Sequence, residues 1–407
     1  MAGPLSHIKV LDLSRVLAAP CTGHNLADLG AEVIKIERPK NGDDSRAFGP
    51  PWLKDASGKD TTESAYFLAA NRGKKSITIN LSVAAGQALV RKLAAQCDVL
   101  LENYKYGDLA RYGLGYDDLK AVNPGLVYCS VTGFGQTGPY RERPGYDFMI
   151  QGMGGLMSIT GERDDLPGGG PQRVGVPIVD IMTGMYASIA VCAALAHRER
   201  TGAGQHLDLA LLDTQVAFLA NQAMNYLASG EVPGRLGNAH PNIVPYQTFN
   251  TRDGAIILAC GNDNLFNRFC ETAGCQHLAG DARFATNGKR VENRAALVPL
   301  LNEIFATRTT HDWVEALEAA GVPNGPINDI QQVFEEPQLV ARGMRIELDH
   351  PLAGKVPLVA SPMRFSETPL EFKSPPPTLG QHTDEILRGM LGMSAAEIAQ
   401  LRAAGVV

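Results

Sequence analysis

The chain lacks the cysteine patterns of a secreted or zinc-binding protein. Its cysteines are odd in number and scattered, and no two form a Cys-x-x-Cys pair: Cys21, Cys97, Cys129, Cys192, Cys260, Cys270 and Cys275. This spacing argues against a disulfide framework and a structural zinc site, and favours a reducing, cytoplasmic location. The helical His-x-x-x-His and His-Glu-x-x-His patterns are also missing, so we expect no catalytic metal.

The sequence has no excess of positive charge and no long uncharged apolar run. Its formal net charge of −6 gives no support for nucleic acid as a partner. The first apolar stretch contains Lys9, Asp12 and Arg15, which a secretory signal would lack. The most apolar run, Ile181 to His197, is shorter than a bilayer span and contains Thr, Ser and Gly, so we predict a core helix and no membrane partner.

The overall composition is typical of a soluble globular enzyme, with 44% hydrophobic and 20% charged residues. At 407 residues the chain is longer than one ordinary core, which predicts two domains.

Short β-type runs alternate with helical stretches in the first third of the chain. Ile8–Leu13 is predicted as a strand, Pro20–Leu29 as a helix that ends at Gly30, and Glu32–Ile36 as a second strand paired in parallel. The alternation continues with strands and helices at Ser76–Leu81, Ala84–Gln96, Val99–Glu102, Leu119–Val122 and Leu126–Val131. This pattern predicts an α/β fold with an open, mostly parallel sheet and helices on both faces.

The opening unit lacks the glycine fingerprint of a dinucleotide-binding fold. Its turn, Ser14 to Pro20, contains no Gly-x-Gly-x-x-Gly, although Glu37 stands where a ribose-binding acid would be. The missing glycines argue against a nicotinamide-dependent dehydrogenase.

A second region follows a helical stretch at Leu209–Leu227. It has a Pro/Gly-rich entry and then predicted elements, at Ala255–Cys260 (strand), Leu265–Thr272, Arg294–Ala306 and His311–Ala319 (helices). We predict a smaller α+β domain at 228–328, joined by linkers at 211–227 and 329–344. The large domain is then built from residues 1–210 and 345–407.

Asp180 is the only formally charged residue between Arg173 and Arg198. If this apolar segment is buried, the carboxylate must be hydrogen-bonded, be neutralised or have a functional role. One interpretation is that Asp180 caps the helix that follows it. The other is a catalytic carboxylate. The two are compatible, because a helix N-terminus also keeps a carboxylate ionised and nucleophilic.

Several segments, taken together and in order, resemble the family III coenzyme A (CoA) transferases over essentially the whole chain. They are Val10–Val16, Gly30–Pro39, Asn71–Ser76, Glu102–Tyr104, Gly133–Pro139, Gly145–Asp147, the Asp180 segment and Leu379–Thr383. The resemblance implies a Rossmann-like large domain, a smaller domain and a homodimer of two interlocked chains. It also implies that Asp180 is the nucleophile.

The resemblance implies a covalent mechanism. A donor acyl-CoA and Asp180 give a mixed anhydride, CoA thiolate then gives an aspartyl-CoA thioester, and an acceptor acid reverses the sequence. The CoA thioester is thus a substrate, and we expect no permanently bound cofactor. The partners are an acyl-CoA such as succinyl-CoA, a free carboxylic acid and a second copy of the chain.

By analogy with the family, several residues are expected to contact CoA. Val16 and Ala18 line the pantetheine and acyl region, and Tyr146 lies beside the nucleophile. The candidates for the phosphates and adenine are Arg38, Lys75 and Arg111, and Asn103 and Tyr104 follow a strand end where α/β sheets place ligands.

Two departures disfavour an oxalate or formate substrate. Leu17 stands where formyl-transferring members have Gln, and no poly-Gly run occurs at Cys260–Asn264. The segment Gly237–Phe249 instead resembles the succinyl-CoA:glutarate type. A dicarboxylate needs a cation for its distal carboxylate, and the candidates are Arg15, Arg46, Arg72 and His240.

Two alternatives remain open at this point. An α-methylacyl-CoA racemase uses a Gly-His-Asp motif, but this chain has Tyr146 in place of the histidine, and a tyrosine with a pKa of ~10 is a poor α-proton base. A non-catalytic CoA-binding protein would leave Asp180 without a role.

Overall fold

The computed structural model describes residues 3–407, which form two compact units. The first contains the chain up to Gly155, Val174–Ala223 and Pro337–Val407; the second contains Leu156–Arg173 and Met224–Glu336. Residues 156–173, which we assigned to the large domain from sequence, thus group with the second unit. The two stretches expected as linkers are mostly helical, with α9 (Leu211–Ala217), α10 (Ala220–Ser229), α16 (Ile330–Glu335) and α17 (Pro337–Ala341).

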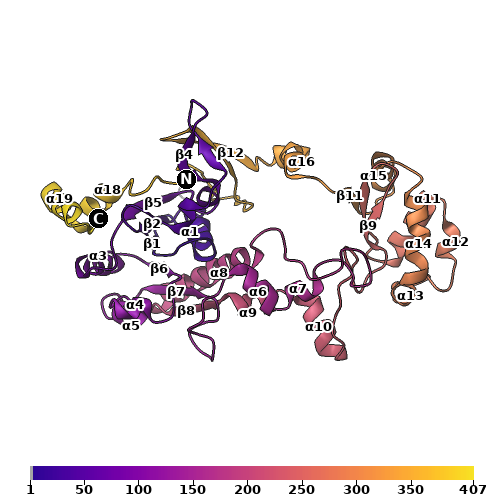
Figure 1. Cartoon of the computed structure of the whole chain (residues 1–407), viewed down its shortest axis with the longest axis horizontal. Helices are drawn as coiled ribbons and strands as arrows, with labels where there is room; N and C mark the ends of the chain where they lie inside the picture. Colours follow the sequence, from indigo (N-terminus) through magenta and orange to yellow (C-terminus); the bar gives the residue numbers. More distant parts are fainter. Residues whose placement is uncertain (1–2) are drawn as a thin grey trace. The chain divides into compact units, whose positions relative to one another are not determined.

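A six-stranded, fully parallel sheet forms the centre of the first unit. Figure 1 labels its strands. Its strands are β1 (Lys9–Asp12), β2 (Glu32–Glu37), β5 (Lys74–Thr78), β6 (Val99–Glu102), β7 (Val127–Thr132) and β8 (His206–Ala210). Their order is β5-β2-β1-β6-β7-β8, so the direction of winding reverses between β1 and β6. The predicted α/β fold is confirmed, and the reversal marks the crevice where such sheets bind ligands.

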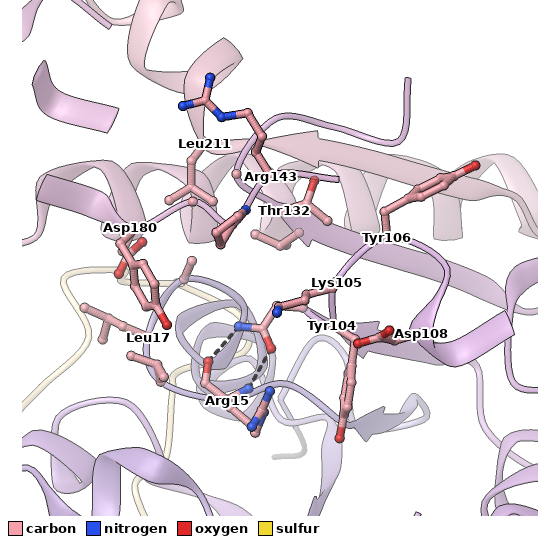
Figure 2. A pocket seen from close by; sticks show the side chains of 18 of the residues that line it. Arg15, Leu17, Tyr104, Lys105, Tyr106, Asp108, Thr132, Arg143, Asp180 and Leu211 are labelled. Atoms are coloured by element: carbon pink, nitrogen blue, oxygen red, sulfur yellow. Dashed lines mark hydrogen bonds between the residues drawn. The ribbon is translucent and has the colours of Figure 1, made fainter. Parts of the chain in front are cut away.

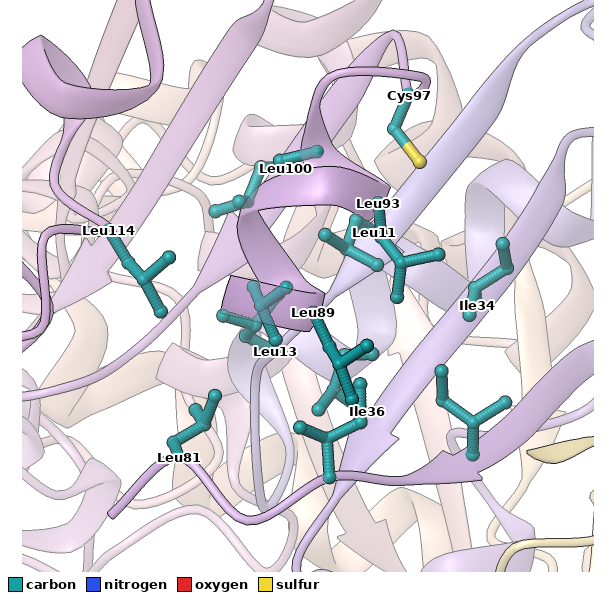
Figure 3. Close-up of a cluster of buried hydrophobic side chains, with 14 of the residues drawn as sticks. Leu11, Leu13, Ile34, Ile36, Leu81, Leu89, Leu93, Cys97, Leu100 and Leu114 are labelled. Atoms are coloured by element: carbon teal, nitrogen blue, oxygen red, sulfur yellow. The ribbon is translucent and has the colours of Figure 1, made fainter. Parts of the chain in front are cut away.

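Apolar side chains alternate between the two faces of this sheet. Val10 joins the cluster beneath α1 (Ala18–Asp28) and α8 (Ile178–Thr201), while its neighbour Leu11 joins the opposite cluster. That second cluster, drawn in Figure 3, is covered by α3 (Ala84–Ala94), α5 (Tyr116–Lys120), α18 (Thr383–Leu391) and α19 (Ala395–Ala403). Burial on both faces explains why the strands are almost continuously apolar.

Helix α8 is longer than the apolar run in the sequence suggested. Its 24 residues make it long and apolar enough to cross a membrane by length and composition alone. Within the first unit it packs against α1 and the sheet through Ala187, Val191 and Leu195, all buried. These contacts place one side of α8 in the core, as predicted, whereas Met185, Tyr186 and Ile189 on the same helix are exposed within the described chain.

The C-terminal part of the chain packs on the first part of the sheet. Arg46 donates to the carbonyl of Pro377 (2.9 Å), the Asn80 N–H to that of Val406 (2.8 Å) and the His382 N–H to that of Ser76 (2.9 Å). The smaller elements of this unit are η1 (Asp44–Ala47), β3 (Trp52–Lys54), β4 (Asp60–Ser64), α2 (Ala65–Leu68), α4 (Asp108–Arg111), α6 (Asp147–Met153), β12 (Arg345–His350) and β13 (Gly354–Val359). The C-terminal segment thus completes the first unit.

The second unit is an α+β structure with its own core. Its antiparallel sheet has the order β11-β10-β9, with bounds Asn324–Pro326, Ala255–Ala259 and Tyr246–Asn250. The helices are α7 (Leu156–Ile159), α11 (Asp263–Ala273), α12 (Gln276–Ala279), α13 (Asn287–Glu292), α14 (Arg294–Phe305) and α15 (Thr310–Ala319). Phe249, Phe305 and Trp313 pack ring against ring in its centre.

Candidate active site

A cavity of about 330 Å³ opens at the point where the sheet reverses its winding. Its walls come from the segment after β1 (15–18), the loop after β6 (103–106), the end of β7 with the segment that follows it (131–133 and 141–146) and the first turn of α8. In Figure 2, Asp180 and Leu17 lie at one end of the drawn residues, and Tyr106 and Asp108 lie at the other. The cavity therefore extends away from Asp180 toward the loop that follows β6.

The loop after β1 is held by hydrogen bonds from three neighbouring segments. The Arg15 N–H donates to the Asn103 side chain (2.8 Å), whose amide donates back to the Arg15 carbonyl (2.7 Å), as Figure 2 shows. Lys35 donates to the Ser14 carbonyl (2.8 Å), and the Val16 N–H donates to Asp43 (3.1 Å). These contacts hold Val16 at a φ of 69°, which is unusual for a β-branched residue and marks a strained, fixed loop.

Asp180 lies in the first turn of α8, two residues after the helix begins at Ile178. Among residues 3–407 its carboxylate accepts no hydrogen bond, so it does not cap the helix. Burial, followed by the negative charge of Asp147, raises its pKa to about 7. The expectation that the helix N-terminus would keep Asp180 readily ionised is therefore wrong, because another residue occupies the N–H groups that would stabilise its charge.

That residue is Asp147, which we did not single out from the sequence. Its carboxylate accepts hydrogen bonds from the N–H groups of Val179 (2.8 Å) and Asp180 (3.3 Å). A sequence signal was present, since Asp147 is the third residue of the Gly145–Asp147 motif, but the spacing of 33 residues gives no hint of this contact.

Two glycines explain why the segment 143–147 can lie across the end of β7. A Cβ on Gly133 would lie 2.5 Å from the Gly145 Cα, and one on Gly145 would lie 2.4 Å from the Gly133 Cα. The backbones touch here without side chains between them. Arg143 and Tyr146 are thereby placed at the cavity wall.

The structure brings seven of the residues expected from sequence to this one cavity: Arg15, Val16, Ala18, Asn103, Tyr104, Tyr146 and Asp180. They come from segments up to 165 positions apart in the chain, from residue 15 to residue 180. Their clustering at the switch point agrees with the strand-end rule for ligand sites.

The three cations expected at the phosphates do not line the cavity themselves. Arg38 pairs with Asp44 and Arg111 with Asp108, and these two aspartates line the cavity. Lys75 pairs with Glu32 and Glu385, at 2.8 Å each. Arg38 and Arg111 thus contact residues of the cavity wall without lining the cavity. Lys75 is held by its two glutamate partners, away from the cavity wall.

Arg46 and Arg72 are structural and are withdrawn as substrate ligands. Arg46 is 7% exposed and donates to Glu37, Glu63 and the Pro377 carbonyl. Arg72 is 2% exposed and donates to Asp28 and the Val359 carbonyl. Every guanidinium nitrogen of both side chains already has an acceptor.

His240 belongs to the second unit. Its Nδ1 accepts from the Asn242 N–H (3.1 Å), and its ring packs against Tyr246. Burial, with the charge of Arg294, lowers its pKa, so it is neutral at physiological pH and a weak partner for a carboxylate.

Three cations that we did not list from the sequence line the cavity: Lys105, Arg141 and Arg143. Arg141 lies over the ring of Tyr106, and Arg143 lies over Phe134 and Tyr140. No carboxylate in residues 3–407 forms an ion pair with Arg143. The only sequence signal was their position beside the quoted motifs.

Comparison with known proteins shows the family to which a chain with this site is similar. The sequence model described as CoA-transferase family III matches residues 5–383. The chain is 49% identical to a succinate–glutarate CoA-transferase of Agrobacterium fabrum (94% of this chain, 95% of the relative). It is 44% identical to the human succinyl-CoA:glutarate CoA-transferase (99% and 90%). A crystal structure of a CAIB/BAIF family protein from Brucella suis superposes with a TM-score of 0.84 at 51% identity, covering 96% of this chain and all of that one.

Proposed function

The chain belongs to CoA-transferase family III, and on that premise we propose that it exchanges CoA between succinyl-CoA and a dicarboxylic acid of the size of glutarate, with Asp180 as the nucleophile. The observation that carries this proposal is one cavity that joins a carboxylate without hydrogen bonds to cationic side chains on the segments after β6 and β7. The names of the relatives support the choice of acids.

The proposed steps balance in atoms and charge. The Asp180 carboxylate attacks the thioester carbonyl, the C–S bond breaks, and CoA leaves as a thiolate. The thiolate attacks the Asp180 carbonyl of the mixed anhydride, releases succinate and forms an aspartyl-CoA thioester. The acceptor acid then takes succinate's place and the steps run in reverse.

The start of α1 supports this chemistry. Ala18 is the first residue of α1 and lines the same cavity as Asp180. The first N–H groups of a helix have no acceptor within it, so those of Ala18 and Ala19 can stabilise the negative oxygen of a tetrahedral intermediate. Val16, two residues before Ala18, lines the same cavity.

The cations of the cavity suit the charged ends of both substrates. Lys105, Arg141 and Arg143 lie on the segments after β6 and β7 and are available to the phosphates of CoA, with Arg38 and Arg111 behind them. Val16 and Ala18 contact the pantetheine arm, and Asn103 and Tyr104 contact CoA at the end of β6.

We assign the distal carboxylate of the acceptor to Arg15. This side chain is one-third exposed at the cavity wall, and its Nε has no hydrogen-bond partner. Its Nη1 donates to Asp44 (3.0 Å), which holds the guanidinium in place, and since the Nε is buried, we assign the substrate carboxylate to the terminal nitrogens.

Glutarate should exceed valerate as an acceptor by about tenfold or more in kcat/KM. A charge-assisted hydrogen bond to the distal carboxylate contributes roughly 1.5–3 kcal/mol, and each ~1.4 kcal/mol is tenfold. The measurement is a panel of free acids against succinyl-CoA.

The matched variants are Arg15→Met and Arg143→Met. Arg15→Met should abolish the preference for glutarate and leave the rate with valerate near normal. Arg143→Met should weaken CoA binding and keep the preference. Equal rates of the parent with both acids would remove the basis for a dicarboxylate pocket.

The alternative of a racemase is disfavoured by Tyr146. Among the described residues no histidine lies at the cavity wall, and Tyr146 is 72% exposed in place of the paired base that a racemase needs. Exchange without inversion at the α-carbon of a chiral acyl-CoA separates the two activities.

A homodimer of interlocked chains completes the proposal. Apolar side chains are exposed on α8 and α9 of the first unit, at Met185, Tyr186, Ile189 and Val216. Such a dimer cannot separate without partial unfolding, so dissociation and unfolding should coincide in a concentration series. A folded, active monomer in sedimentation at low concentration would refute it.

The seven cysteines are all free, and six of them lie in the cores of the two units or beside them. Their unpaired state supports the proposed cytoplasmic location.

A further inference from the structure

We propose that Asp147 is a positioning residue for the transfer: its buried carboxylate fixes the first turn of α8 and leaves the Asp180 carboxylate free of hydrogen bonds and beside a negative charge. This inference rests on the proposed role of Asp180 as nucleophile. It concerns a residue that makes no covalent bond in the reaction.

The hydrogen bonds around Asp147 join three segments. Asp147 is 8% exposed at the first position of α6. One of its oxygens accepts the N–H groups of Val179 and Asp180, and the other accepts the Gln151 side-chain amide (2.6 Å). Gln151 is fully buried, and its own carbonyl oxygen accepts the Val174 N–H (2.9 Å). Asp147 and Gln151 thus hold the chain at both ends of the segment 174–180.

Helix α8 has no cap within its own sequence. Its N-cap is Pro177, which offers no side-chain acceptor, and the Ile178 N–H bonds to the Val176 carbonyl. Asp147 therefore serves as the cap from 33 positions away. Side-chain caps of this kind fix the first turn and stabilise the helix they terminate.

The same contacts make the charged form of the Asp180 carboxyl unfavourable. The N–H groups that would stabilise its carboxylate are bound to Asp147, and Asp147 adds a like charge. Burial and this charge raise the pKa of Asp180 to about 7. A more basic group is the stronger nucleophile once it is ionised. Acylation turns the carboxylate into a neutral anhydride or thioester, so the repulsion from Asp147 is relieved in the step that the enzyme must accelerate.

The other titratable groups around Asp180 do not share this role. Burial raises the pKa of Cys21 on α1 and of Tyr66 on α2 to about 12, so both are uncharged between pH 5 and 9. Arg15, Arg143 and Tyr146 line the cavity. Among the described carboxylates, Asp147 is the source of the negative charge that acts on Asp180.

The test compares Asp147→Asn with the double variant Asp147→Asn/Gln151→Glu. In Asp147→Asn the side-chain oxygen still accepts from α8, but its new amide faces the amide of Gln151. In the double variant the carboxylate introduced at position 151 accepts from both the new amide and the Val174 N–H. The hydrogen bonds are thus restored. The negative charge moves from position 147, which contacts α8, to position 151, which is farther from Asp180. Thermal stability should fall in the single variant and recover in the double.

The decisive readout is the pH dependence of kcat/KM for succinyl-CoA, which reports the free enzyme. Activity of the parent should rise through a midpoint near 7, as Asp180 ionises. In Asp147→Asn the midpoint should fall by about one pH unit and the plateau rate should drop about tenfold; in the double variant, which keeps a carboxylate at the more distant position 151, both changes should have the same sign and be smaller. A purely structural Asp147 would change stability and leave the midpoint in place.

The outcomes separate this inference from the proposed function. If Asp180→Asn keeps turnover, the nucleophile is wrong and both fall. If Asp180→Asn is inactive while Asp147→Asn keeps the parental midpoint, only the role of Asp147 is overturned. Gln151→Met is the control: it removes both the contact to Val174 and the amide that donates to Asp147, keeps the carboxylate at position 147 and its two bonds to α8, and should keep the parental midpoint.

Discussion

Asp180→Asn and Asp180→Ala abolish CoA exchange between succinyl-CoA and glutarate, by at least ~10⁴-fold in kcat. Neither side chain can form the anhydride, and no other carboxylate of the cavity wall stands at the α8 start. CoA binding should change little, because the cations and the loop after β1 are untouched. The measurement is single-turnover exchange at pH 8, with calorimetric CoA binding as the control. Trapping with hydroxylamine should give an Asp180 hydroxamate in the parent only, and substantial turnover in either variant would contradict the mechanism.

The same Asp180→Asn variant should be more stable than the parent at pH 8. The Asp180 carboxyl has a pKa near 7 when folded and about 3.8 otherwise, so the folded chain binds more protons between these values. Proton binding at Asp180 therefore stabilises the folded chain, and this stabilisation is lost as the pH rises from about 4 to 7 and the proton dissociates. Removing the charge should restore on the order of 2–4 kcal/mol at pH 8 and almost nothing at pH 4. Denaturation at both pH values, at one protein concentration, checks the sign.

Lys74→Met should lower the free energy of unfolding by about 3–5 kcal/mol, because it leaves a buried carboxylate unpaired. Lys74 is 1% exposed and donates to Asp12 (2.9 Å) and to the Pro20 carbonyl (2.8 Å). Burial alone would raise the pKa of Asp12, but Lys74 and Lys35 outweigh it and hold that pKa below its usual range. Asp12 also accepts a hydrogen bond from the Ser14 N–H, just before the loop after β1 that lines the cavity, so activity should fall with stability.

The matched control for Lys74→Met is Asp12→Asn/Lys74→Met. The amide introduced at position 12 still accepts from Ser14 but carries no charge, so the double variant should regain about half of the lost stability. Urea unfolding of the three proteins measures the difference. Equal stability of the single and double variants would show that the charge of Asp12 does not matter.

The pair Asp12–Lys74 also shows where sequence patterns reach their limit. The β-α-β alternation predicted the parallel sheet because period and apolar content are local. The alternation predicted a strand at Ser76–Leu81, whereas β5 covers Lys74–Thr78. The prediction left out Lys74 because a lysine is expected at the surface. Its buried partner, Asp12, lies two strands away and cannot be recognised from a local pattern. Arg46 and Arg72 were misassigned for the same reason, since their acceptors at Pro377 and Val359 lie 331 and 287 residues along the chain.

The residues of the candidate site also fall into two groups, those that local sequence patterns predict and those whose role depends on distant contacts. Residues that follow strand ends, such as Val16, Asn103 and Tyr104, could be placed from motifs and the strand-end rule. Asp147 could not, because its role depends on two N–H groups 32 and 33 residues away and on the absence of a local cap. Pairing by Asp44 and Asp108 likewise removed Arg38 and Arg111 from the cavity wall, which no spacing in the sequence reveals.

The return of the chain to the first unit has a consequence for its synthesis. Arg46, Ser76 and Asn80 are translated early, but their partners on the backbone at Pro377, His382 and Val406 are translated much later, 331 residues later in the case of Pro377. On the ribosome the second unit is complete while the first still lacks one of its covers. The face of the sheet beside β5 therefore stays exposed to water, and to chaperones, until residues 377–406 have been translated and can pack on it.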